Sequence, residues 1–193
     1  MEALEPSSMG EEQFINQQKG LEIRTPRLIL RPVREDDGED LFDIRSRSEV
    51  MDWSLTRLTD PDISHTLRNM CRWNKEENLG LAVVEISAPN RFCGTVEFNT
   101  SGDRMDLGYL FHPDVWGKGY ATEAAQAAIK ALWESDELRK LRESAKDELY
   151  ASTQAGNERS YSVLRKCGFE MIEEFEDEYG KGEGWRLRRV KAT

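Results

Sequence analysis

Apolar and charged residues alternate along several short stretches of this chain, and the alternation predicts strands. A period of two places every second side chain on one face of a sheet, so a half-buried strand shows this pattern. Two such stretches stand near the beginning of the chain, Leu21–Arg24 and Arg27–Arg31. Three further strands are expected toward the end of the chain, at Glu148–Thr153, Phe169–Phe175 and Trp185–Val190.

Three apolar stretches in the middle of the chain predict an antiparallel meander. They are Leu79–Ile86, Phe92–Phe98 and Met105–Phe111. Residues 88–90 and 99–103 separate them and contain Pro, Asn, Gly and Asp, which favour turns. Because parallel strands need much longer connections, we expect neighbouring members of the meander to pair antiparallel.

Apolar residues three and four positions apart predict helices between these strands. The helix expected at 120–133 carries an alanine-rich stripe that suits close packing on a sheet, and Asp136–Lys146 is so charged that we expect an exposed extension. A helix expected from Asn157 ends at Gly168, which fits a left-handed C-cap. The other expected N-caps are Asp36 or Asp37 for a helix ending near Ser48, and Asp60, before Pro61, for a helix ending near Trp73.

The order of these elements predicts one α/β domain on a mostly antiparallel sheet, spanning residues 21–193. Residues 1–20 are acidic and poor in apolar side chains, so we expect a mobile tail there. Residues 176–184 are acidic and rich in glycine, and we expect them to form a mobile surface loop.

Composition narrows the class of protein. The net charge of −10 argues against a nucleic acid bound through a basic face, and no apolar run is long enough to span a membrane. Three cysteines without CxxC spacing and only two histidines argue against a metal site and indicate reduced thiols. The beginning of the chain lacks the apolar centre of a signal peptide, so we expect a cytoplasmic or, more broadly, intracellular protein, the nucleus included.

A candidate ligand-binding turn lies directly after the last strand of the meander. Gly117 and Gly119 lead into the alanine-rich helix, whose first N–H groups lack partners and whose dipole adds positive potential. Such a turn suits a phosphate or pyrophosphate. The spacing excludes the Walker A pattern, and Thr122 replaces the third glycine of the dinucleotide pattern G-x-G-x-x-G. A pyrophosphate turn for coenzyme A is the reading that fits.

The segment Trp116–Ala124 resembles the acetyl-CoA loop of the GNAT N-acetyltransferase superfamily, [QR]-x-x-G-x-[GA]. Gly119 and Ala121 match its fourth and sixth positions, whereas Trp116 replaces the usual Gln or Arg, as is typical of the ribosomal-protein-alanine (Rim-type) branch. The resemblance extends from about Leu21 to Val190. Further stretches similar to that branch follow in the right order: Thr25–Pro32, Glu49–Trp53, Leu107–Tyr109, Asn157–Ser160 and Val163–Phe169.

The resemblance implies a GNAT-like mixed, mostly antiparallel sheet that is flanked by helices and split after Phe111, with acetyl-CoA in the V-shaped gap. It also implies that the backbone of Leu110 and Phe111 binds the pantetheine arm and that the Leu110 amide stabilises the oxyanion. Asn157 would hydrogen-bond the pantetheine, and Ser160 would lie near the sulfur. The pyrophosphate loop would consist of Trp116, Gly117, Lys118, Gly119, Tyr120, Ala121 and Thr122.

Acyl transfer to an amine needs a base for the amine proton and a proton donor for the departing thiolate. Many family members place a tyrosine donor where this chain has Leu164, so we expect Ser160 or water to take that role. Asp106 is the first candidate base, because by period two it shares a strand face with Leu110, and Glu97 is the second.

Three other residues attract attention but have structural interpretations. His112 precedes a proline at a strand end, so we expect it to stabilise the turn. Trp53 and Trp73 could line an acceptor pocket, although tryptophans of helices and loops usually pack into the core.

The expected function is acetyl-CoA-dependent N-acetylation of a primary amine, without a metal. The acceptor could be a protein N-terminus, a polyamine or another small amine, and fold alone does not choose among them. A non-catalytic CoA-binding module that acts through protein contacts is the alternative. Neither a nucleic-acid nor a membrane partner is expected, and a homodimer is possible.

Overall fold

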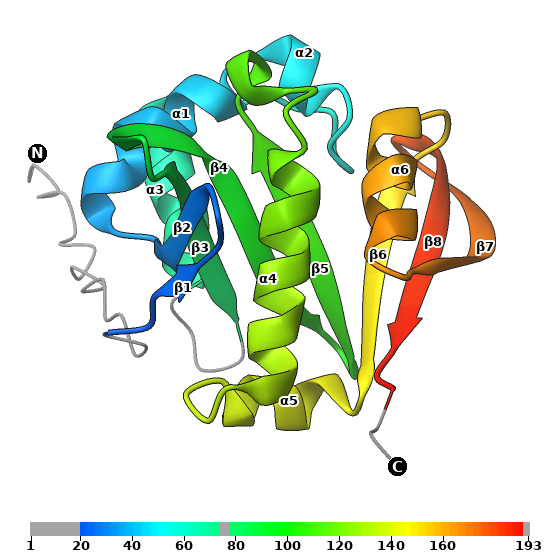
Figure 1. Ribbon diagram of the computed structural model, residues 1–193. Helices are drawn as coiled ribbons and strands as arrows, with labels where there is room; N and C mark the ends of the chain where they lie inside the picture. The colour runs from blue at the N-terminus through cyan, green and yellow to red at the C-terminus, as the bar shows by residue number, and fades with distance from the viewer. Residues whose placement is uncertain (1–19, 74–77, 191–193) are drawn as a thin grey trace, which may run out of the picture.

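The computed structural model describes residues 20–73 and 78–190, so the expected tail at 1–20 lies almost wholly outside the described residues. Their strands form one sheet with the order β1-β2-β3-β4-β5-β6-β8-β7 (Figure 1). All neighbours pair antiparallel except β5 and β6. The strands are β1 Ile23–Arg24, β2 Leu28–Pro32, β3 Leu79–Glu85, β4 Ala88–Ser101, β5 Arg104–Phe111, β6 Glu148–Gln154, β7 Glu170–Asp177 and β8 Gly180–Arg188.

Helices cover both faces of the sheet (Figure 1). The larger core lies between the sheet and α4, whose buried residues include Ala124, Ala128 and Leu132. On the opposite face Leu41 of α1 and Met70 of α3 pack in a smaller core. The helices are η1 Glu35–Asp37, α1 Gly38–Arg45, α2 Ser48–Met51, α3 Ile63–Arg72, η2 Pro113–Val115, α4 Tyr120–Glu134, α5 Arg139–Ala145 and α6 Glu158–Lys166.

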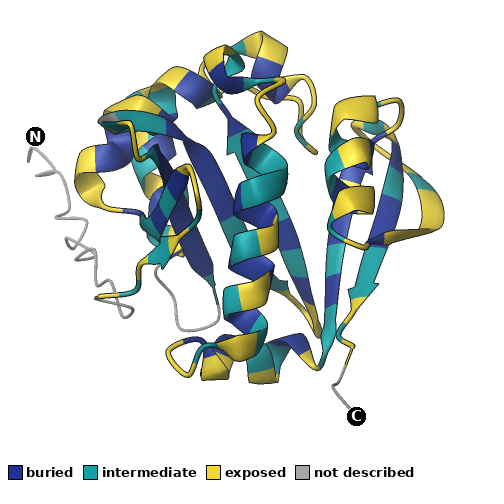
Figure 2. Ribbon diagram, viewed as in Figure 1, coloured by how far each residue is buried: buried dark blue, intermediate teal, exposed yellow. Residues whose placement is uncertain are grey.

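The sheet opens between β5 and β6. These parallel strands share one register pair, Asp106 with Tyr150, and then separate toward the ends at which Phe111 and Gln154 stand (Figure 1). Burial also varies across the sheet: the central strands are largely buried, whereas most of β7, at the far edge, is exposed (Figure 2). The expected α/β fold with a mixed, mostly antiparallel, split sheet is therefore confirmed.

Two turn predictions are wrong. Residues 88–90 belong to β4, and the chain turns at residues 86–87 instead. The expected loop at 176–184 is a tight turn at residues 178–179 followed by β8. Its glycines permit close packing rather than mobility, since a Cβ at Gly182 would lie 2.3 Å from a ring atom of Phe175.

Two helix predictions also need correction. Asp62, not Asp60, caps α3, and its side chain accepts a hydrogen bond from the His65 amide. The segment expected to be an exposed extension is only partly exposed, because Leu138 and Leu141 belong to the larger core. The many charged residues of this segment outweighed Leu138 and Leu141 in the prediction, although these two leucines pack α5 against the larger core.

Candidate active site

The glycine turn has the conformation that its sequence requires. Gly117 and Gly119 have φ angles of +76° and +79°, which side chains with a Cβ rarely adopt. Gly119 is the N-cap residue of α4, and the Glu123 amide makes the first helical bond back to its carbonyl at 3.1 Å. The amides of residues 120–122 therefore precede the first helical bond and are available to an anion.

Arg27 braces this turn from the β1–β2 connection. Its guanidinium donates to the Lys118 carbonyl at 2.8 Å and to the Glu123 carboxylate at 2.7 Å, and it lies 4.8 Å from the Tyr120 ring centroid. Thr25 donates to the same carboxylate at 2.6 Å. Burial opposes ionisation of Glu123, but these hydrogen bonds lower its pKa below the usual value. Glu123 thus anchors the helix start and stays charged.

The open edge of β5 presents backbone groups to the gap. The His112 amide donates to the Cys93 carbonyl at 2.9 Å, and hydrogen-bonded pairs alternate along an antiparallel ladder. Leu110, paired with Thr95, therefore turns its backbone groups toward β4, whereas Tyr109 and Phe111 turn theirs toward β6. The Phe111 carbonyl does face away from β4, because it accepts from the Trp116 indole at 2.9 Å.

Two hydroxyl groups meet across the gap. The Tyr109 phenol of β5 and the Ser160 hydroxyl of α6 are 2.6 Å apart. The Asn157 side chain caps α6 by accepting from the Ser160 amide at 3.1 Å, which fixes the start of that helix. Burial raises the pKa of Tyr109 above its usual value, so the phenol stays protonated and can donate to Ser160.

The two candidate bases lie at different depths of the cleft. Glu97 pairs with Gly108 across β4 and β5, and a Cβ at Gly108 would lie 3.6 Å from its carboxylate. Its carboxylate accepts hydrogen bonds from Asn99 at 3.1 Å and Thr95 at 3.3 Å. Asp106 stands at the base of the split, opposite Tyr150. Burial raises the pKa of both Glu97 and Asp106.

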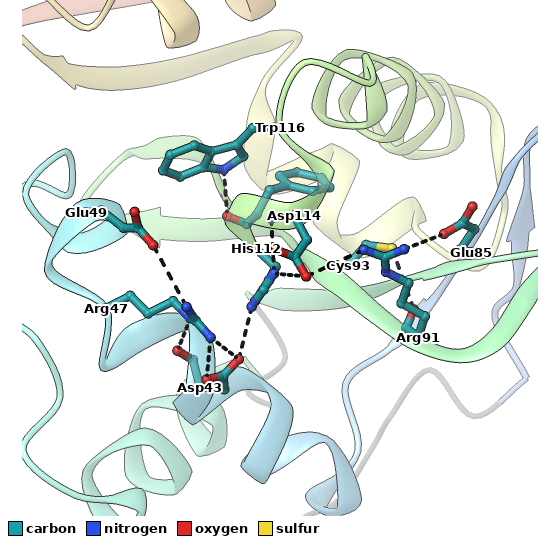
Figure 3. A network of polar contacts seen from close by, with 10 residues as sticks. Asp43, Arg47, Glu49, Glu85, Arg91, Cys93, His112, Asp114 and Trp116 are labelled. Carbon is teal, nitrogen blue, oxygen red and sulfur yellow. Dashed lines mark hydrogen bonds and ion pairs between the residues drawn. The ribbon is translucent and has the colours of Figure 1, made fainter.

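His112 stabilises the turn between β5 and α4 (Figure 3). Its Nδ1 accepts from the Asp114 amide at 3.2 Å, so the proton resides on Nε2, which lies 3.1 Å from the Asp43 carboxylate of α1. Arg47 donates to the same carboxylate at 2.9 Å. The imidazole therefore connects the turn to α1, as expected for a structural role.

One cleft of about 1300 Å³ unites the predicted residues. Lys118 is not among the lining residues, and its carbonyl is bound by Arg27. Trp73 is buried, as expected, but Trp53 is 45% exposed at the cleft, so the core interpretation was wrong for it. The predicted residues that line the cleft are Glu97, Asp106, Leu110, Phe111, Trp116, Gly117, Gly119, Tyr120, Ala121, Thr122, Asn157 and Ser160.

Sequence reasoning missed three residues of this site. Tyr109 and Arg27 stand inside motifs that carried the family resemblance, but the motifs gave no role for their side chains. Arg159 stacks on Trp116 with its guanidinium carbon 4.6 Å from the ring centroid, which joins α6 to the turn. Each contact links segments far apart in the chain, so no local pattern could have revealed it.

The arrangement matches known proteins. A family model described as an acetyltransferase (GNAT) domain matches residues 27–170, more than half of the chain. The N-acetyltransferase YnaD of Bacillus subtilis, described as uncharacterised, is 26% identical over 167 residues, which cover 86% of this chain and 92% of YnaD.

Solved structures share the fold. A GNAT-family acetyltransferase from Bacillus anthracis superposes with a TM-score of 0.71 at 24% identity, covering 87% of this chain and 98% of the other. RimL, a ribosomal L7/L12 α-N-protein acetyltransferase solved with coenzyme A, superposes with a TM-score of 0.72 at 12% identity, covering 87% of this chain and 98% of RimL. With the family model spanning both sides of the split sheet, the chain belongs to the GNAT acetyltransferase family.

Proposed function

We propose that this protein transfers the acetyl group of acetyl-CoA to a primary amine. The observation that carries the proposal is the single cleft that joins the glycine turn, the open edge of β5 and Ser160 with the Glu97 carboxylate. The amides of residues 120–122 bind the pyrophosphate, and the unpaired edge of β5 receives the pantetheine amides as an added strand. No group of three or more His, Cys, Asp or Glu side chains within residues 20–73 and 78–190 could hold a metal.

We assign the oxyanion donor to the Tyr109 amide in place of Leu110, because the register directs Leu110 toward β4. As the thioester bond breaks, the Ser160 hydroxyl donates a hydrogen bond to the departing thiolate while the Tyr109 phenol, 2.6 Å away, donates to Ser160 and keeps its proton; the thiolate then takes its proton from solvent. Leu164 lines the cleft but has no proton to donate, so the position at which many relatives have a tyrosine takes no part in this step.

We assign the base to Glu97 rather than to Asp106. Glu97 lies opposite Gly108, next to Tyr109, whereas Asp106 is three residues and about 10 Å back along β5. A base must reach the amine directly or through one water, and the position of Glu97 next to Tyr109 supports this choice. Burial raises the pKa of Glu97, which makes its carboxylate a stronger base than an ordinary one.

The acceptor that we propose first is a protein N-terminal amine. The Rim-type motifs and the similarity in fold to RimL support this choice. Polyamines and small amines remain the other acceptors to test. No helix of the described residues is long and apolar enough to cross a membrane.

A thiol-release assay over peptides with free N-termini, polyamines and amino acids tests the proposal, together with calorimetric titration of acetyl-CoA. Turnover of a peptide supports it. Tight binding of acetyl-CoA without turnover of any amine indicates the non-catalytic CoA-binding module. Absence of binding refutes both functions.

A further inference from the structure

A glutamine at the end of β6 ties the two sides of the split sheet together. Gln154 is only 3% exposed. Its amide nitrogen donates to the carbonyls of Ser54 and Leu55 at 3.2 and 3.1 Å, and its oxygen accepts from Arg57 at 2.7 Å. Every partner lies in the segment between α2 and α3, about one hundred residues earlier in the chain.

This segment, residues 53–58, which we name the strap, reaches from α2 toward α6 beside the open end of the sheet (Figure 1). Arg57 has a φ angle of +54°, unfavourable for a residue with a Cβ, and its guanidinium lies against Gly180 of β8. Local hydrogen bonds from the Arg57 amide to Ser54 and contacts with the far side of the gap together hold the strap in this shape.

The anchor itself is rigid. The Tyr161 phenol of α6 accepts from the Gly156 amide at 2.6 Å and donates to the Glu183 carboxylate of β8 at 2.7 Å. These bonds fix the chain between Gln154 and Asn157, the cap of α6. Gln154 thus connects the strap to a segment that hydrogen bonds hold in place.

The strap presents apolar side chains to the cleft. Trp53 and Leu55 line it and are 45% and 47% exposed. The same cleft is lined by Trp73 and by Glu97, the proposed base. Exposed apolar groups at the mouth of a cleft indicate a ligand that carries apolar surface there.

We propose that Gln154 is a positioning residue that holds the strap against the acceptor, and that the strap favours an amine with an apolar group beside it. A peptide whose first residue has an aliphatic side chain fits this description. The inference rests on the proposed acetyl transfer. It assigns acceptor recognition to Trp53 and Leu55 and their correct placement to Gln154.

Steady-state kinetics with two peptides that differ only in their first residue, leucine or serine, test the proposal. The wild-type protein is expected to favour the leucine peptide in kcat/KM. Gln154→Ala is expected to raise KM for the leucine peptide by about tenfold or more, with kcat within about threefold and acetyl-CoA affinity unchanged. Gln154→Glu keeps a partner for Arg57 but places an oxygen against two carbonyls, so it is expected to raise the same KM.

Gln126→Ala is the matched control, because Gln126 is exposed on α4 and donates to the Lys166 carbonyl far from the strap. Hydrogen exchange supplies a readout that does not need activity: the strap amides are expected to exchange faster in Gln154→Ala than in the wild type, with α6 unchanged.

Three outcomes overturn the inference: a Gln154→Ala protein with wild-type strap exchange and acceptor KM, an equal loss of acetyl-CoA affinity, or a wild-type preference for the serine peptide. A wild-type protein that acetylates neither peptide refutes the proposed acceptor itself. The hydrogen-exchange result then decides whether Gln154 holds the strap.

Discussion

Replacement of Glu97 by glutamine separates the two candidate bases. The amide has the shape of the carboxylate and can still bond to Asn99 and Thr95, but it cannot remove a proton from the amine. General-base catalysis contributes about 10²–10⁴-fold, so Glu97→Gln is expected to lower kcat/KM for the acceptor by that factor, or about 3–5 kcal/mol of transition-state stabilisation.

The pH dependence gives the reasoning a second test. Burial raises the pKa of Glu97, so the wild-type rate is expected to fall as pH drops through a value above the ordinary 4.5, and Glu97→Gln is expected to lack this limb. A raised carboxyl pKa means that folding stability falls as pH rises through this window, so the variant is expected to melt no lower than the wild type at pH 8.

Stopped-flow or steady-state thiol release between pH 5 and 9 measures both quantities, with Asp106→Asn as the matched control. Asp106→Asn is expected to retain kcat/KM within a few fold and to keep the acid limb. The assignment of the base is refuted if Asp106→Asn loses the limb while Glu97→Gln keeps wild-type activity.

Four further single substitutions and one double variant probe the hydroxyl pair, the glycine turn and the Arg45–Asp60 ion pair. Ser160→Ala and Tyr109→Phe are each expected to lower kcat for thiol release by about tenfold or more, while acetyl-CoA affinity measured by calorimetry changes little; the double variant is expected to lose no more than the worse single variant, because both hydroxyls belong to one chain of hydrogen bonds. Gly119→Ala forces a side chain into a φ of +79° and is expected to weaken acetyl-CoA binding about tenfold in the same titration. Asp60→Ala leaves the partly buried guanidinium of Arg45 without the buried carboxylate that it pairs with, and is expected to lower the free energy of unfolding in urea by about 3 kcal/mol. Burial opposes ionisation of Asp60, but its hydrogen bonds with Arg45 and Thr66 lower its pKa, so its contribution is expected to be lost only as pH falls below about 3.8, the ordinary value.

Each change has a matched control in the chain. Ser144→Ala removes an exposed hydroxyl of α5 and is expected to leave kcat unchanged. Gly102→Ala introduces a similar strain in the β4–β5 turn, at a φ of +63°, without altering acetyl-CoA affinity. Asp62→Ala removes the cap of α3 and costs about 1 kcal/mol. Equal effects in a variant and its control contradict the corresponding prediction.

Part of this fold can be predicted from short segments of the chain alone. Period two predicted the first strands, apolar runs predicted the meander and the alanine stripe predicted α4, because each pattern matches the geometry of one element. The errors share a different cause: composition alone does not distinguish glycines of a loop from Gly182 and Gly184, which give room to side chains of β7. Likewise, either aspartate of the Asp60–Asp62 segment could cap α3, and the partner Arg45 decided which one became buried.

The sequence by itself determined the family, the strand–turn–helix at Trp116–Thr122 and the helix cap at Asn157, since these depend on backbone conformation and on neighbours a few residues away. The tertiary structure alone decided which side chains meet. Tyr109 reaches Ser160 and Gln154 reaches Ser54 because β5 and β6 diverge, and divergence depends on the order and register of the whole sheet. Period two gives the face of a strand but not its partner, so the choice of Glu97 over Asp106 required the pairing with Gly108.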